Sequence, residues 1–168
     1  MSSYITTSSK IHFTPVSPDP EQIVIRDIAH ALSLMTRANG HFPEFYSVGQ
    51  HCIHCYEEAV ARKYSPFLCK ACLLHDASEA YLADITRPVK QFLPGYLEIE
   101  KRLQDTIYEK FLGRVPTETE QTAISSVDDT LLYYEFDHYM GEKLQKKPPK
   151  LYSCLLYTSP SPRDKRQS

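Results

Sequence analysis

Two histidines and two aspartates in this sequence have side chains that could together bind one divalent cation. His75 and Asp76 are adjacent, His51 lies upstream of them and Asp128 lies downstream. Imidazole nitrogens and carboxylate oxygens suit a borderline or hard divalent cation, which polarises phosphate and activates water. The four residues therefore predict a site for one ion, with Mn, Co, Mg, Fe, Ni and Zn all open as its identity.

Helix signals place these four residues on separate segments. Ser47–Gln50 has the spacing of a capping box, so His51 should lie in the first turn of a helix. Ser65–Pro66 predicts the start of another helix, which we expect to continue through His75 and Glu79. On that helix His75 and Asp76 would project about 100° apart, so both could lean toward one ion.

The remaining signals complete an all-α pattern. We expect Asp27 to cap a first helix that ends near Gly40. The other expected elements are a short strand near Ile11–Phe13, a loop at Asp84–Pro88, a helix from Tyr96 that stops at Gly113, and a helix that opens at Pro116–Thr117. We therefore predict a single helical bundle of about five or more helices.

The ordered set of His51, the pair His75–Asp76, and Asp128 resembles the ligand motif of the HD-domain phosphohydrolases. The run HDASEAYLADITRPVK, residues 75–90, extends the likeness. It is closest to small phage- and prophage-encoded members and looser to the bacterial HD 5'-deoxynucleotidases. The resemblance implies an HD-domain fold, and Asp128 matches the distant aspartate of the motif. Asp129 is the competing choice, but Asp128 is favoured because Val127–Leu131 should pack inward.

Two further carboxylates follow the histidine-aspartate pair. Glu79 comes four residues after His75, so on one helix it would lie on the same face and could exchange a proton with a metal-activated water. Asp84 opens the next loop and could position the water or protonate the leaving oxygen. The resemblance gives the matching residues these catalytic roles. The alternatives are an exposed helix carboxylate for Glu79 and a turn residue for Asp84.

A phosphate substrate also needs cationic partners, and Arg37 is the first candidate. Its planar guanidinium suits bidentate phosphate binding, and the resemblance places a phosphate-binding arginine here. The alternative is a surface arginine at a helix C-terminus. The other expected substrate-binding residues are His41, Thr86, Arg87, Pro88 and Lys90. The nucleotidase relatives carry an aromatic residue directly after this arginine, whereas Ala38 stands here, which puts base and sugar discrimination in doubt.

A rival motif comes from four cysteines. Cys52-x2-Cys55 and Cys69-x2-Cys72 are separated by 13 residues, a spacing found in structural zinc sites. Both pairs lie in segments with helical periodicity and lack the turn residues of a zinc knuckle. We therefore expect small buried side chains. We also expect His54 to lie on the surface.

Composition limits the remaining possibilities. The 168 residues carry a net charge of −2, which gives no electrostatic basis for stable nucleic-acid binding. We find no apolar run long enough for a membrane span and no signal-peptide core. The five cysteines suit a reducing cytosol, so we expect a cytoplasmic protein. A homodimer is suggested by the resemblance alone.

The chain divides into three parts by composition. Residues 1–22 read as an extended N-terminal segment and residues 23–153 as the catalytic domain. Residues 154–164, CLLYTSPSPRD, resemble the translation of a sequencing adapter, so we expect residues 154–168 to be a disordered, adapter-derived tail and the natural protein to be cut near Ser153. The alternative is a natural proline-rich tail.

These features together predict an enzyme. The expected activity is metal-dependent hydrolysis of the phosphate of a (deoxy)nucleotide, with a nucleoside 5'-monophosphate as the first choice of small-molecule substrate. A dNTP triphosphohydrolase is the alternative within the same class. A non-catalytic nucleotide-binding module or a four-cysteine zinc interaction module is the alternative of another class.

Overall fold

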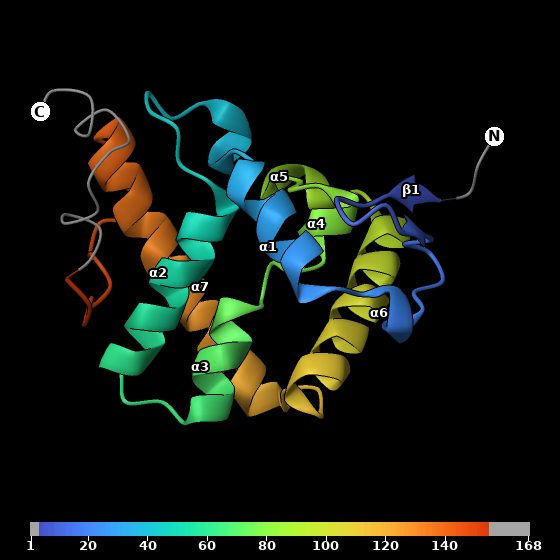
Figure 1. Ribbon diagram of the computed structural model, residues 1–168. Coiled ribbons are helices and arrows are strands. Elements are labelled where there is room, and N and C mark those ends of the chain that lie inside the picture. Colours follow the sequence, from blue (N-terminus) through green and yellow to red (C-terminus); the bar gives the residue numbers. More distant parts are fainter. Residues whose placement is uncertain (1–3, 155–168) are drawn as a thin grey trace, which may run out of the picture.

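Helices dominate the computed structural model, which describes residues 4–154 (Figure 1). In chain order the elements are β1 (Ile5–Thr6), β2 (His12–Phe13), the 3-10 helix η1 (Pro20–Gln22), α1 (Ile25–Leu34), the 3-10 helix η2 (Arg37–Gly40), α2 (Val48–Ala61), α3 (Pro66–Leu73), α4 (Glu79–Leu82), α5 (Arg87–Lys90), α6 (Pro94–Leu112) and α7 (Glu118–Met140). The two short strands pair antiparallel. The prediction of a mainly α fold is confirmed.

The helix starts that the sequence predicted are confirmed by their capping contacts. The Ser47 hydroxyl oxygen accepts a hydrogen bond from the Gln50 N–H, and the Gln50 side-chain oxygen accepts one from the Ser47 N–H, so α2 begins with a capping box. Ser65 caps α3, and Thr117 caps α7. Gly113 ends α6 in the left-handed conformation with φ of 82°. These local signals fix where α2 and α7 begin.

The core lies where α2 packs against α1, α3 and α7. Val127 and Leu131 on α7 are fully buried, as the predicted register requires. Gly49 permits the close approach of α1 and α2, because a Cβ at this position would meet the Leu32 backbone at 3.2 Å. Figure 1 shows α2, α3 and α7 grouped together, with α6 beyond them. The site therefore forms at the edge of a packed core.

The first helix differs from its prediction at both ends. It begins at Ile25 with Val24 as its N-cap, so Asp27 is not the cap. The buried Asp27 carboxylate instead accepts hydrogen bonds from the Ser9 N–H and hydroxyl, both at 2.8 Å. This contact attaches the N-terminal hairpin to α1. The helix ends at Leu34 rather than near Gly40.

Arg37 consequently lies in η2 and not at the C-terminus of a long helix. The backbone at Thr36 forms a bridge with Ser47, and the Arg37 N–H donates to the Tyr46 carbonyl at 2.8 Å. Ala38 and Asn39 follow with positive φ of 52° and 51°. These long-range backbone contacts end α1 early and turn the chain at Arg37.

The predicted continuous helix through His75 and Glu79 is wrong. Helix α3 ends at Leu73, and His75 and Asp76 lie in the turn before α4. Gln104 on α6 stabilises this break, because its side-chain NH₂ donates to the Leu74 carbonyl at 2.7 Å and its oxygen accepts from the Ser78 N–H at 3.0 Å. The two adjacent residues therefore do not project 100° apart on a regular helix.

Two further predictions concern the loop after α4 and the tail. The short helix α5 begins at Arg87, within the segment that was predicted as a loop, and continues to Lys90. Residues 155–168, which make up nearly all of the predicted adapter-derived tail, lie outside the described part of the chain. Among residues 4–154, none of the helices has at once the length and the apolar side chains that a membrane crossing requires.

Candidate metal centre and adjoining cavity

The four predicted metal ligands come together from three parts of the chain. His51 Nε2 on α2 lies 3.3 Å from His75 Nε2 and 3.1 Å from Asp128 Oδ1 on α7. His75 Nε2 lies 3.3 Å from Asp76 Oδ1 and 3.8 Å from Asp128 Oδ1. His51 Nε2 also lies 3.8 Å from Asp76 Oδ2. Nitrogen and oxygen donors thus surround one small region.

Both imidazole rings are oriented by acceptors on their opposite side. His51 Nδ1 lies 2.5 Å from Glu135 Oε1, and His75 Nδ1 lies 2.8 Å from the Cys72 carbonyl oxygen. A carboxylate and a carbonyl can only accept, so each Nδ1 carries the proton. In its neutral form each ring then directs the Nε2 lone pair toward the shared region, the usual arrangement of metal-binding histidines. The donor set fits a divalent cation.

The electrostatics of this cluster favour positive charge at its centre. Burial lowers the pKa of His75, but Asp76, Cys55 and Asp128 outweigh this, and the pKa is raised well above its ordinary value. The same balance, with Glu135 and Asp128 among the raising groups, raises the pKa of His51. The carboxylates therefore attract a cation or a proton to the point where the two rings meet.

The structure distinguishes between the two neighbouring aspartates on α7. Asp128 lies against both histidines, whereas the Asp129 side chain is 59% exposed and contacts Arg87 Nη1 at 2.5 Å. Arg87 also contacts Asp128 Oδ2 at 2.5 Å. Asp128 is therefore the residue of the pair that joins the cluster, as the register argument predicted.

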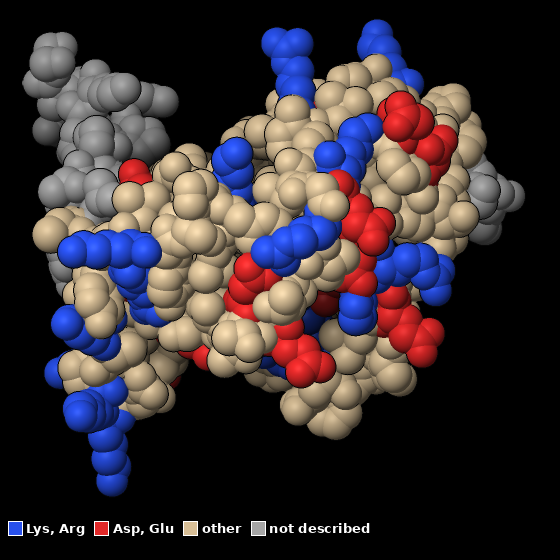
Figure 2. Space-filling view, turned by 90° about the horizontal axis from the view of Figure 1, so that it is seen from below, with Lys and Arg blue, Asp and Glu red and all other residues tan. Residues whose placement is uncertain are grey.

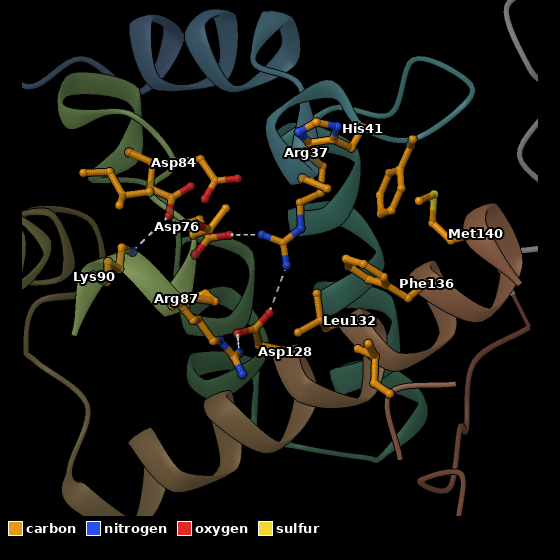
Figure 3. Close-up of a pocket in the computed structure, with 17 residues that line it drawn as sticks. Arg37, His41, Asp76, Asp84, Arg87, Lys90, Asp128, Leu132, Phe136 and Met140 are labelled. Atoms are coloured by element: carbon orange, nitrogen blue, oxygen red, sulfur yellow. Dashed lines mark hydrogen bonds and ion pairs between the residues drawn. The ribbon is translucent and has the colours of Figure 1, made fainter. Parts of the chain in front are cut away.

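Arg37 is buried beside the candidate metal centre. Its side chain is 11% exposed, with Nη1 3.3 Å from Asp76 Oδ2 and Nη2 3.3 Å from Asp128 Oδ1. Its Nε lies 3.4 Å from Glu135 Oε2. Figure 3 shows the guanidinium pointing between the two aspartates. The alternative of an exposed arginine at a helix C-terminus is therefore excluded.

A cavity of about 510 Å³ adjoins this cluster. Its lining residues are Arg37, Ala38, His41, Phe42, Asp76, Glu79, Asp84, Ile85, Thr86, Arg87, Pro88, Lys90, Asp128, Leu132, Phe136, Met140 and Leu144. All the predicted catalytic and substrate-binding residues are among them. In Figure 3 the labelled charged residues lie mostly on one side, and Leu132, Phe136 and Met140 follow α7 on the other.

Glu79 and Asp84 are buried acids at the charged end of this cavity. Glu79 is 3% exposed, which excludes the exposed-carboxylate alternative, and burial followed by the charges of Asp76 and Asp84 raises its pKa to about 9. Burial also raises the pKa of Asp84. Glu79 Oε1 lies 3.3 Å from Lys90 Nζ, while Oε2 has no hydrogen-bond partner within residues 4–154. A buried oxygen in this state is suited to a water or substrate partner.

Two buried residues behind His51 were not assigned a role from the sequence. Glu135 is fully buried on α7, seven residues after Asp128 and so on the same helix face. Tyr46 donates its hydroxyl proton to Glu135 Oε1 at 2.9 Å and lies 2.8 Å from His54 Nδ1. The predicted surface position of His54 is therefore wrong, because its side chain is 5% exposed. The i+7 spacing from Asp128 was the signal for Glu135.

The four cysteines of the rival motif are buried free thiols, and two of them approach the histidines. Two groups of described residues that include one of these cysteines have ligand atoms within 4.8 Å of one another: His51 with Cys55 and His75, and Cys52 with His75 and Asp76. Neither group joins Cys52 and Cys55 to Cys69 and Cys72, so the described part of the chain does not assemble the four-cysteine site. Burial raises the pKa of Cys52, which favours its neutral thiol.

Replacing all four of these cysteines with alanine or serine should leave the metal content unchanged. The reason is that two Nε2 atoms and two carboxylates already surround the site. Burial of the thiols means that stability should fall, by about 1 kcal/mol per site. Metal analysis and thermal unfolding check this result, and a Cys69/Cys72 double variant is the control away from the histidines. Loss of metal from a Cys52/Cys55 double variant alone would instead indicate mixed histidine-cysteine ligation.

The surface around the site carries charges of both signs. Figure 2 shows Lys and Arg side chains interspersed with Asp and Glu on the face seen from below. Lys90 is part of this pattern within the cavity, since it also contacts Glu100 at 2.6 Å. On this face the mixed charges do not form the continuous basic surface that a long polyanion binds.

Two curated proteins are similar to this chain, while no family model matches it. The uncharacterized protein YfdR of Escherichia coli (strain K12) is 39% identical over 109 residues, which are 65% of this chain and 58% of that protein's length. The chain thus spans little more than half of that relative. The uncharacterized protein RCAP_rcc00048 of Rhodobacter capsulatus is 34% identical over 134 residues, covering 75% of this chain and 67% of that protein. By this similarity the chain belongs to the same protein family as RCAP_rcc00048.

Proposed function

We propose that this protein is an HD-type, metal-dependent phosphohydrolase that acts on a (deoxy)nucleotide, with a nucleoside 5'-monophosphate as the preferred substrate. One observation carries the proposal. His51 and His75 direct their Nε2 atoms to the same point as the carboxylates, because both Nδ1 atoms are already hydrogen-bonded elsewhere. In the neutral rings these Nε2 atoms are acceptors, and acceptors that converge with carboxylates in this way favour a bound cation.

The charged end of the cavity has the groups that phosphate hydrolysis needs. A divalent cation held by His51, His75, Asp76 and Asp128 would polarise the phosphate and lower the pKa of water. Arg37 lies beside these carboxylates, so its N–H groups can donate to the oxygens of a phosphate bound at the same place. As the water oxygen bonds to phosphorus it gives up a proton, which restores the proton donor, and as the ester P–O bond breaks the leaving oxygen takes a proton. Glu79 is suited to supply it, because its raised pKa keeps it protonated near neutrality.

The other end of the cavity suits an organic leaving group. Leu132, Phe136 and Met140 follow Asp128 at intervals of four residues, so they form one stripe that leads away from the phosphate end at about 6 Å per interval. Phe42 lines the same region. Phe42 and Phe136 thus provide aromatic surface that Ala38 does not. A nucleoside has a flat base that such a surface can contact, and the absence of an aromatic residue at position 38 predicts loose base selection.

A nucleotide panel tests the proposed function. The full chain is incubated with nucleoside mono-, di- and triphosphates in Mn²⁺, Co²⁺ or Mg²⁺, and released phosphate and nucleoside are measured. We expect inorganic phosphate from monophosphates, with little discrimination between bases. Release of intact triphosphate would support the dNTP triphosphohydrolase instead. Metal-dependent nucleotide binding without turnover would identify a binding module and overturn the enzymatic proposal.

The phosphate role of Arg37 gives a separate prediction. In a Glu79→Gln background that binds but does not turn over, Arg37→Ala should weaken nucleotide binding by about 1.5–3 kcal/mol and leave nucleoside binding nearly unchanged. Arg37→Lys should restore only part of the loss, because a point charge cannot replace the planar fork. Calorimetric titration measures both ligands. Arg62→Ala is the control, since Arg62 also pairs with a buried carboxylate but does not line the cavity. Equal loss of nucleoside and nucleotide binding would exclude the phosphate role.

A further inference from the structure

Glu135 contacts both His51, a proposed metal ligand, and Arg37, the proposed phosphate-binding residue. Its Oε1 lies 2.5 Å from His51 Nδ1, and its Oε2 lies 3.4 Å from Arg37 Nε. Asp76 and Asp128 also contact these two residues, but on the metal-facing Nε2 of His51 and on the terminal nitrogens of Arg37. Glu135 alone among these carboxylates contacts the opposite nitrogen of the imidazole. It therefore cannot ligate the ion that His51 faces.

The contacts of Glu135 determine the state of both partners. As an acceptor it holds the proton of His51 on Nδ1, which leaves Nε2 free to ligate. As a partner of Arg37 Nε it directs the two terminal nitrogens toward Asp76 and Asp128, where the phosphate is expected. The hydroxyl of Tyr46 donates to the same Oε1 and limits the rotation of the carboxylate.

We propose that Glu135 is a positioning residue that orients His51 for the cation and Arg37 for phosphate, and so couples the two binding events through one buried carboxylate. The inference rests on the proposed function, because it assigns those partners to His51 and Arg37. It goes beyond that function in predicting that cation affinity and phosphate affinity change together when a residue that touches neither ligand is altered.

The decisive variant is Glu135→Gln, which keeps the side-chain size. A glutamine can present its NH₂ group to His51 Nδ1, which favours the tautomer with the proton on Nε2 and removes the ligating lone pair. Metal-free protein is titrated with Mn²⁺ and, in a second series, with inorganic phosphate in the presence of Mn²⁺. We expect Mn²⁺ to bind about 10–100-fold more weakly, with a parallel loss of phosphate affinity. Neither measurement depends on turnover.

Glu58→Gln is the matched control. Glu58 is also fully buried and also pairs with an arginine, since its Oε1 lies 2.8 Å from Arg62 Nε, but it accepts its other hydrogen bonds from the N–H groups of Tyr152 and Ser153. It should lose stability without losing Mn²⁺ or phosphate affinity. Equal weakening in both variants, or wild-type affinities in folded Glu135→Gln, would overturn the positioning role.

A measurement on the unaltered protein avoids dependence on how well Glu135→Gln folds. In ¹⁵N-histidine-labelled protein loaded with Zn²⁺, the NMR signals of His51 should show the proton on Nδ1, in a strong hydrogen bond. Metal-dependent shifts of the His51 signals without a strong hydrogen bond at Nδ1 would contradict the inference while leaving the hydrolase proposal intact. If the wild-type protein takes up neither Mn²⁺ nor Zn²⁺ at His51, the proposed function fails together with this inference.

Discussion

His75→Ala should remove bound metal and phosphohydrolase turnover together. His75 Nε2 lies within 3.8 Å of all three of the other predicted metal ligands, which are His51, Asp76 and Asp128. Its loss removes one of two nitrogen donors, and the remaining carboxylates are then drawn toward Arg37. We expect wild-type protein to hold one equivalent of divalent cation and the variant to hold almost none, with activity at the background of the assay.

The control for this prediction is His30→Ala. His30 is an exposed histidine on α1, outside the cluster and the cavity. This variant should keep both metal and turnover. Metal analysis after dialysis and phosphate release measured on the same samples compare the two. Full metal occupancy in His75→Ala at wild-type affinity would show that the ion is held elsewhere, for example by the cysteines near His51.

The parts of the fold that could be predicted correctly are those that residues close together in the sequence determine. Ser47 and Thr117 have capping partners three residues later, and Gly113 follows the last periodic residue of its helix, so short-range chemistry determines these boundaries. The register of α7 was also predictable, because Val127 and Leu131 follow helical spacing. This register places Asp128 beside the core edge, and it equally placed Glu135 on the same face without revealing the residue's partners.

The missed features depend on contacts between distant residues. The sequence near Leu74 and Ser78 contains no signal that would end a helix. The break there is stabilised by a distant residue, because the side chain of Gln104 on α6 hydrogen-bonds to the backbone of both residues. The early end of α1 depends in the same way on the bridge between Thr36 and Ser47. The resemblance therefore indicated His75, Asp76 and Arg37 as candidate site residues, but helical periodicity placed them on the wrong local structures. Their convergence is a tertiary property.

Glu79→Gln should separate binding from chemistry. Glu79 is buried at the start of α4, where its N–H donates to the Asp76 carbonyl at 3.0 Å and its Oε2 has no protein hydrogen-bond partner within residues 4–154. Since its raised pKa makes it a proton donor near neutrality, its replacement by an amide should lower kcat by roughly 10²–10⁴-fold. Metal content and nucleotide affinity should change little, because Glu79 is not among the four predicted ligands.

The matched control for Glu79 is Glu100→Gln. Both carboxylates contact Lys90 Nζ, Glu100 at 2.6 Å and Glu79 at 3.3 Å, but only Glu79 lines the cavity that contains Arg37. If the effect came from freeing Lys90, the two variants would lose similar activity. If Glu79 transfers the proton, only its own variant should show the large loss in kcat, and its pH-rate profile should lose one ionisation. A near-normal rate in Glu79→Gln would remove this residue from the mechanism and leave Asp84, whose pKa is also raised by burial, as the remaining acid at the charged end of the cavity.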